Sequence, residues 1–65
     1  METWIVSKQL LDATALASSA TSKLTDALAS NSPGQVRALM ADALAELQSA
    51  MDRLQDATKA YEQYG

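Results

Sequence analysis

Apolar and polar residues follow one another along most of this chain with the period of an α-helix. Apolar or alanine residues recur in alternating steps of four and three, in two uninterrupted runs, as they do in helices that pack side by side. The first run contains Val6, Leu10, Ala13, Ala17, Ala20, Leu24 and Ala27, and the second contains Val36, Met40, Ala43, Leu47, Ala50, Leu54, Ala57, Tyr61 and Tyr64. We therefore predict two long helices whose apolar seams face each other and form the core.

The two runs are separated by one segment rich in turn-forming residues, at 30–35. Ser32 and Gln35 have the spacing of a capping box, in which the serine oxygen accepts from the glutamine amide and the glutamine side chain returns to the cap. Pro33 then occupies the first helical position, where its missing N–H costs nothing. Asn31 suits the left-handed residue that closes the preceding helix.

A connection this short makes the two helices antiparallel neighbours. The sequence therefore predicts an all-α fold, an antiparallel two-helix hairpin that forms a single domain over residues 1–65. We expect the helices at 4–30 and 33–63, with a turn at 31–32.

Each helix carries more apolar residues than one seam uses, and such a surplus usually marks an interface. We therefore predict that the hairpin is completed by oligomerisation. The aromatic residues near the two chain ends add possible anchors for binding, because Trp and Tyr are favoured at interface hot spots. The predicted interface residues are Trp4, Leu11, Leu16, Leu28, Leu39, Leu44, Met51, Tyr61 and Tyr64.

Size and composition also favour association. The chain has 65 residues and no Cys, and thirteen of its residues are Ala. A domain this small is marginally stable alone and usually needs a disulfide, a metal or a partner. Without Cys or His, a disulfide is excluded and structural zinc is not expected.

The residues that carry most enzyme chemistry are missing. The absence of His and Cys excludes Ser-His and Cys-His nucleophiles, and a thin hairpin has no room for a substrate cavity. We expect no enzyme activity, no cofactor and no metal. The acidic residues along the second helix are interpreted as a solvated face. A cation-binding or catalytic role for Asp42 and Glu46 is a further alternative.

Charge and hydropathy narrow the choice of partners. The net charge is −3, and the five cations are scattered, whereas a nucleic-acid surface needs clustered Lys and Arg. No apolar run approaches the length of a membrane span. The first residues lack the features of a cleavable secretory signal. We expect no nucleic acid, no membrane span, and either a cytoplasmic location or export by a leaderless route.

Residues 28–42 resemble the middle of type III secretion needle subunits, which are small leaderless helical hairpins. The similarity is carried by Asn31, Pro33 and the segment 39–41, and Trp4 near the start is a further shared feature. The chain lacks a second turn proline and the long aliphatic C-terminal segment of that family. The resemblance covers about a third of the chain.

The sequence therefore predicts a non-enzymatic structural subunit that assembles with copies of itself through helix packing. The resemblance narrows this expectation to a secretion needle or similar filament. The alternative is a small adaptor or co-chaperone that binds one helical partner in a discrete complex.

Overall fold

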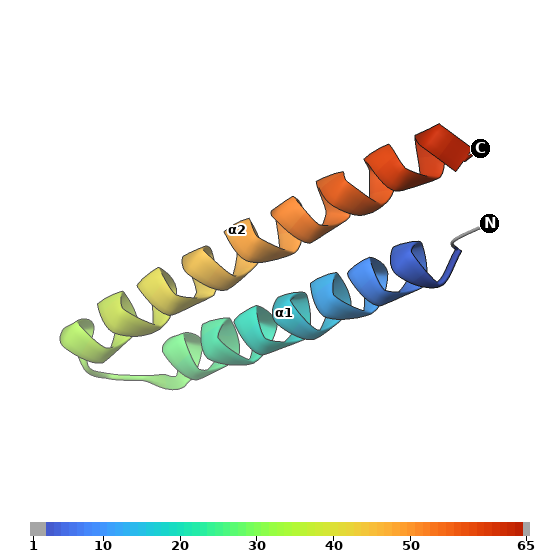
Figure 1. Cartoon of the computed structure of the whole chain (residues 1–65). Coiled ribbons are helices and arrows are strands. Elements are labelled where there is room, and N and C mark those ends of the chain that lie inside the picture. Colours follow the sequence, from blue (N-terminus) through green and yellow to red (C-terminus); the bar gives the residue numbers. More distant parts are fainter. Residues whose placement is uncertain (1–2, 65) are drawn as a thin grey trace.

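The computed structural model describes the backbone of residues 3–64 and the side chains of residues 6–63. It contains two α-helices, α1 (Thr3–Ala29) and α2 (Pro33–Tyr64). They lie side by side in opposite directions, with the turn at one end and both chain ends at the other (Figure 1). The Cα atoms span 50 × 13 × 11 Å. The predicted two-helix hairpin is confirmed, and its helix bounds agree with the prediction to within one residue.

The turn is held by side-chain hydrogen bonds that differ in part from the predicted capping box. The Gln35 amide donates to the Ser32 hydroxyl oxygen at 3.4 Å, as predicted. The Gln35 side chain does not return to Ser32. It accepts a bond from the Ser30 hydroxyl at 3.1 Å, and the Ser32 amide donates to the same Ser30 oxygen. Ser30 therefore links the last turn of α1 to the first turn of α2.

The predicted left-handed residue at Asn31 is wrong. Every non-glycine residue in the described part of the chain has a negative φ. Helix α1 closes instead with a tight bond from the Ser30 amide to the Ala27 carbonyl, at 3.2 Å. This three-residue closure satisfies a terminal carbonyl and leaves no need for a left-handed residue.

The contact between the helices is made mainly by alanine. The buried apolar residues are Ala20, Ala43, Ala50 and Ala57, each 8% exposed or less. Three of the four are spaced by seven residues along α2, so they form one straight row that faces α1. Small side chains at the contact allow the two helix axes to approach closely.

The prediction that the larger seam residues also form the core is wrong. These residues stay 38–55% exposed, and they are Leu10, Leu24, Met40, Leu47 and Leu54. The cause is the 3.6-residue period of the α-helix. A side chain three residues before or four residues after a buried alanine points about 40–60° to one side of that alanine around the helix axis. With the alanine row pointing at α1, the leucines and methionine are displaced to the same side of the hairpin.

The hairpin consequently has little core of its own. Within the described part of the chain, no large side chain is fully buried. An alanine side chain contributes little apolar area, and burial of area supplies most of the free energy of folding. Two helices joined mainly by alanine contacts are therefore expected to need further packing to be stable.

Candidate interaction surface

The displaced large residues form one apolar surface that runs along both helices, here called the open face. On each helix its members are spaced by seven residues, or by the three or four that complete a turn, so they share one side. The open face consists of Leu10, Ala13, Thr14, Ala17, Thr21, Leu24 and Leu28 of α1 and of Met40, Leu44, Leu47, Met51, Leu54 and Thr58 of α2. These residues are all uncharged, and the large ones among them are exposed.

The middle of the open face combines a hollow with a ridge. A groove of about 480 Å³ lies between the helices and is lined by residues of both. The groove is lined on α1 by Leu10, Ala13, Thr14 and Ala17 and on α2 by Leu47, Ala50, Met51 and Leu54. In its middle, the small Ala13 and Ala17 of α1 lie opposite the longer Met51 and Leu47 of α2. The surface is therefore low over α1 and high over α2.

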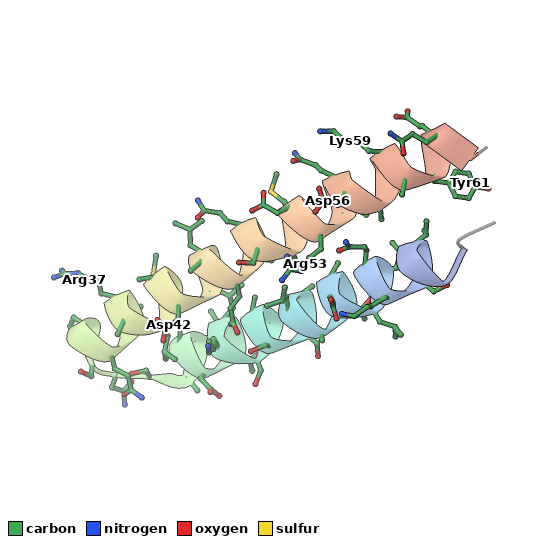
Figure 2. All side chains as sticks on the ribbon, in the orientation of Figure 1. Arg37, Asp42, Arg53, Asp56, Lys59 and Tyr61 are labelled. Atoms are coloured by element: carbon green, nitrogen blue, oxygen red, sulfur yellow. The ribbon has the colours of Figure 1, made fainter. Side chains whose placement is uncertain are left out.

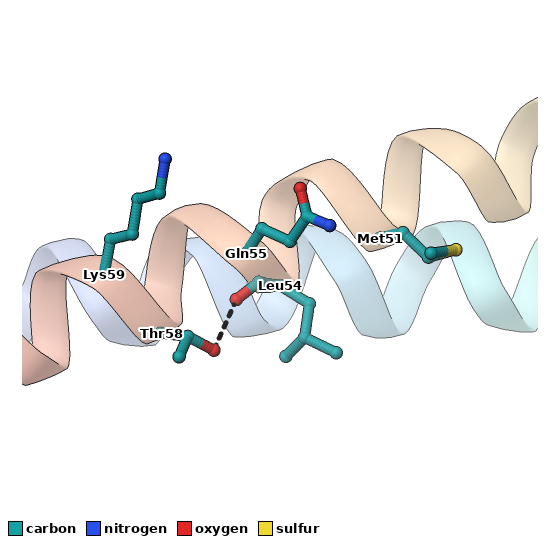
Figure 3. Close-up of a pocket in the computed structure, with 5 residues that line it drawn as sticks. All are labelled: Met51, Leu54, Gln55, Thr58 and Lys59. Carbon is teal, nitrogen blue, oxygen red and sulfur yellow. Dashed lines mark hydrogen bonds between the residues drawn. The ribbon is translucent and has the colours of Figure 1, made fainter.

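The open face continues along α2 toward the open end of the hairpin. Here a second shallow hollow of about 450 Å³ is lined by Met51, Leu54, Gln55, Thr58 and Lys59 (Figure 3). The Thr58 hydroxyl donates to the Leu54 carbonyl at 2.9 Å, so its proton is already bonded within the helix.

The threonines at the α1 side of the open face bond in the same way. Thr14 donates to the Leu10 carbonyl at 2.8 Å, and Thr21 donates to the Ala17 carbonyl at 2.9 Å. A hydroxyl that donates within its own helix leaves no unpaired donor when a partner covers it. These residues can therefore be buried at low cost.

The opposite side of the hairpin carries charged bonds between the helices, and it is here called the ion-pair edge. Glu46 of α2 accepts a hydrogen bond from the Ser19 hydroxyl at 2.7 Å, and its other oxygen lies 3.0 Å from the Lys23 ammonium. Near the open end, Arg53 Nε lies 3.9 Å from the Asp12 carboxylate. Figure 2 shows Arg53 between the two helices.

These bonds perturb the acid–base properties of Glu46. The hydrogen bond from Ser19, followed by the hydrogen bond from Lys23, lowers the pKa of the Glu46 carboxyl below its ordinary value of 4.5. Both bonds favour the charged form of the carboxylate. Ion pairs this close to the surface contribute little stability individually, so their main effect is to fix which sides of the helices meet.

The acidic residues of α2 are therefore only in part the solvated face that the sequence indicates. Asp42 and Asp52 are exposed, but Glu46 is partly buried and paired across the hairpin. Its carboxylate is occupied by Lys23 and Ser19, and no cluster of three metal-ligating side chains occurs among the described residues. The geometry gives no support to a cation site at Asp42 and Glu46.

The predicted interface residues fall into separate groups. Leu28, Leu44 and Met51 are exposed on the open face, and Tyr61 is exposed on the side of α2 nearest the start of α1 (Figure 2). Leu11 is exposed on the outer side of α1, away from α2 and from the open face.

Two of the predicted residues lie elsewhere, and two cannot be placed. Leu16 and Leu39 are partly buried within the hairpin, so the prediction that the hairpin leaves them unused is wrong. They lie one heptad before Lys23 and Glu46 and share the ion-pair edge with them. The side chains of Trp4 and Tyr64 lie outside the described residues.

The sequence did not lead us to expect the larger seam residues on the open face. These are Leu10, Leu24, Met40, Leu47 and Leu54, which it assigned to the core. The signal that could have found them is the composition of the second run. Its alanines and its large residues occupy separate heptad positions, so only one of the two rows can point straight at α1.

Over the described residues, neither α1 nor α2 has a stretch long and apolar enough to cross a membrane. Comparison with protein-family models, curated proteins and solved structures gave no match. Function is therefore inferred from the chain's own geometry.

Proposed function

We propose that this chain is a non-enzymatic structural subunit that assembles with copies of itself through the open face. The observation that carries the proposal is a continuous apolar surface on a hairpin whose buried contact residues, within residues 6–63, are all alanines. Exposed apolar patches of this kind usually mark sites of protein association. A four-helix bundle formed by two hairpins would cover the open face and supply the missing core.

The dimensions of the open face support this proposal. The hairpin is 50 Å long, and two adjacent helices are together about 20 Å wide. The face therefore offers on the order of 1,000 Å² per chain, compared with about 800 Å² per partner in a stable interface of standard size.

The distribution of charge favours a second copy as the occupant. Among residues 6–63, the charged groups that pair across the helices all lie on the ion-pair edge. The middle of the open face carries no charged residue for a charged partner to recognise, and the charged side chains beside it lie near its ends, at Lys59 and Arg37. A second copy presents the same apolar middle and keeps both ion-pair edges in water, so association leaves the cross-helix ion pairs hydrated.

Sedimentation velocity from low to high micromolar concentration tests the proposal. We expect the wild-type chain to sediment as an oligomer whose population rises with concentration, and Leu47→Lys to sediment as the monomer. Ser49→Lys is the matched control, because Ser49 is exposed and lies two residues after Leu47, on the side of α2 opposite the open face. A wild-type chain that is a stable monomer at every concentration would refute self-assembly.

Two other interpretations can be distinguished from a discrete self-assembly, namely an open filament and an adaptor for a different protein. One open face accommodates one neighbouring copy, which supports a discrete assembly over an open filament. The secretion-needle interpretation rests on the resemblance of residues 28–42 alone, and filaments in negative-stain electron microscopy would favour it. A wild-type monomer that forms a defined complex only with a different helical protein would favour an adaptor.

A further inference from the structure

We infer that two copies pair about a two-fold axis parallel to the helices, with both turns at the same end and α1 of each copy on α2 of the other. This inference rests on the proposed function, since it names the geometry of self-assembly through the open face. Two properties carry it. One is which residues of α1 and α2 lie at the same height along the hairpin axis, here called level with each other, and the other is the size of the side chains at each height.

The cross-helix bonds fix these levels. Ser19 bonds Glu46, and Asp12 lies against Arg53, so residues whose numbers sum to about 65 are level. Leu10 is thus level with Leu54 at one end of the open face, and Leu24 is level with Met40 at the other.

The rows between these ends are uneven. Ala13 is level with Met51, and Ala17 is level with Leu47, and all four residues line the same groove. In each row α1 contributes a small side chain and α2 contributes a large one. This is the hollow over α1 and the ridge over α2 described above.

A rotation of 180° about an axis parallel to the helices makes this surface complementary to itself. The rotation places α2 of the second copy over α1 of the first, at the same level. Leu47 of each copy then lies over Ala17 of the other, and Met51 lies over Ala13. Both ridges enter both hollows, which is the alternation of large and small residues that a packed core requires.

The other two-fold arrangement lacks this complementarity. If the second copy is reversed end to end, α1 packs on α1 and α2 packs on α2. Leu47 then meets Leu47 of the second copy, while Ala17 meets Ala17. The ridges hold the two copies apart over the hollows, and the interface retains voids that natural cores avoid.

Distances between spin labels distinguish the two arrangements, and the absence of native Cys makes single labelling straightforward. Asn31→Cys places a label in the exposed turn, and Gln48→Cys places one near the middle of the outer side of α2. Pulsed electron–electron dipolar spectroscopy then measures the distance between the two labels of an assembly. Each labelled protein is first shown to sediment like the unlabelled chain.

With both turns at one end, the Asn31 labels are expected within about 30 Å of each other, since a four-helix bundle is about 20 Å wide. End-to-end reversal would separate them by roughly the 50 Å length of the hairpin. The Gln48 labels are near the middle in both arrangements, so they serve as the control and should give a short distance in either case.

The outcomes separate the inference from the proposed function. An Asn31 distance near the hairpin length, with a short Gln48 distance, overturns the inference and leaves self-assembly standing. A monomer in sedimentation with no dipolar coupling at either site overturns both. A short distance at both sites supports both.

Discussion

Leu10 and Leu11 are adjacent leucines on α1, and the open face predicts opposite consequences for truncating them. Leu10 lies on the open face and is 44% exposed, whereas Leu11 lies on the outer side and is 69% exposed. If exposure alone decided, Leu11→Ala would weaken assembly more. If the open face is the contact, Leu10→Ala weakens assembly and Leu11→Ala leaves it unchanged.

The size of the effect follows from the area that remains to be covered. Complete burial of a leucine side chain stabilises by about 1.5–3 kcal/mol. Leu10 has 44% of its surface left to bury, which corresponds to about 0.7–1.3 kcal/mol per chain. A pair contains two copies of Leu10, so Leu10→Ala should weaken the dissociation constant roughly 10- to 80-fold.

Sedimentation equilibrium of the wild type and both variants measures these dissociation constants directly. Circular dichroism at the same concentrations shows whether the helices remain formed, because loss of helix would make the comparison meaningless. Equal weakening by the two substitutions, or a larger effect of Leu11→Ala, would refute the assignment of the contact to the open face.

Three further predictions concern the hairpin itself, and each is measured by denaturation at fixed protein concentration. Ala43→Leu should destabilise by about 1–3 kcal/mol, because it overpacks a buried helix contact, whereas Ala45→Leu on the exposed side should change little. Ser32→Ala should cost about 1 kcal/mol by removing the N-cap of α2, and Ser49→Ala, at an exposed site within α2, should not; equal effects would show that the cap contributes nothing. Because the pKa of Glu46 is lowered in the folded hairpin, its charged, paired carboxylate contributes stability in full at pH values above its ordinary pKa of 4.5. This contribution is lost as the pH falls through the lowered pKa. Glu46→Gln should flatten that part of the pH profile, and an unchanged profile would contradict the cross-helix pairing.

The fold could be predicted because its determinants are local. Two heptad runs and one proline-containing turn specify two helices and their direction, and the helix bounds follow from Pro33 at the start of α2. The details of the turn could not be predicted in the same way. Ser30 bonds the Gln35 side chain and Ser32 bonds the Gln35 backbone amide, and only the path of the chain decides which serine takes which group.

The candidate surface was harder to predict, because it depends on a rotation of the helices about their axes. A heptad pattern defines a stripe, but the stripe here contains a row of alanines beside a row of leucines. Leu47 and Ala50 lie about 60° apart around the axis of α2. A rotation of the helix by that angle would therefore exchange which of the two points at α1 and which is exposed. The sequence pattern alone does not choose between these rotations.

The ion-pair edge supplies the physical reason for the rotation that is observed. Turning the leucine row toward α1 would carry Glu46 away from Ser19 and Lys23 and would separate Arg53 from Asp12. The same edge also limits assembly to one side.

A second chain placed against the ion-pair edge would have to desolvate a charged carboxylate and its lysine, and burying such groups costs several kcal/mol per ion unless new partners compensate. The open face carries no such penalty, since its threonine hydroxyls are bonded within their helices. The hairpin therefore has one side that stays hydrated and one side that can lose its water to a partner. Because only one side can be covered, each chain takes a single neighbour, which favours a closed pair over an unlimited polymer.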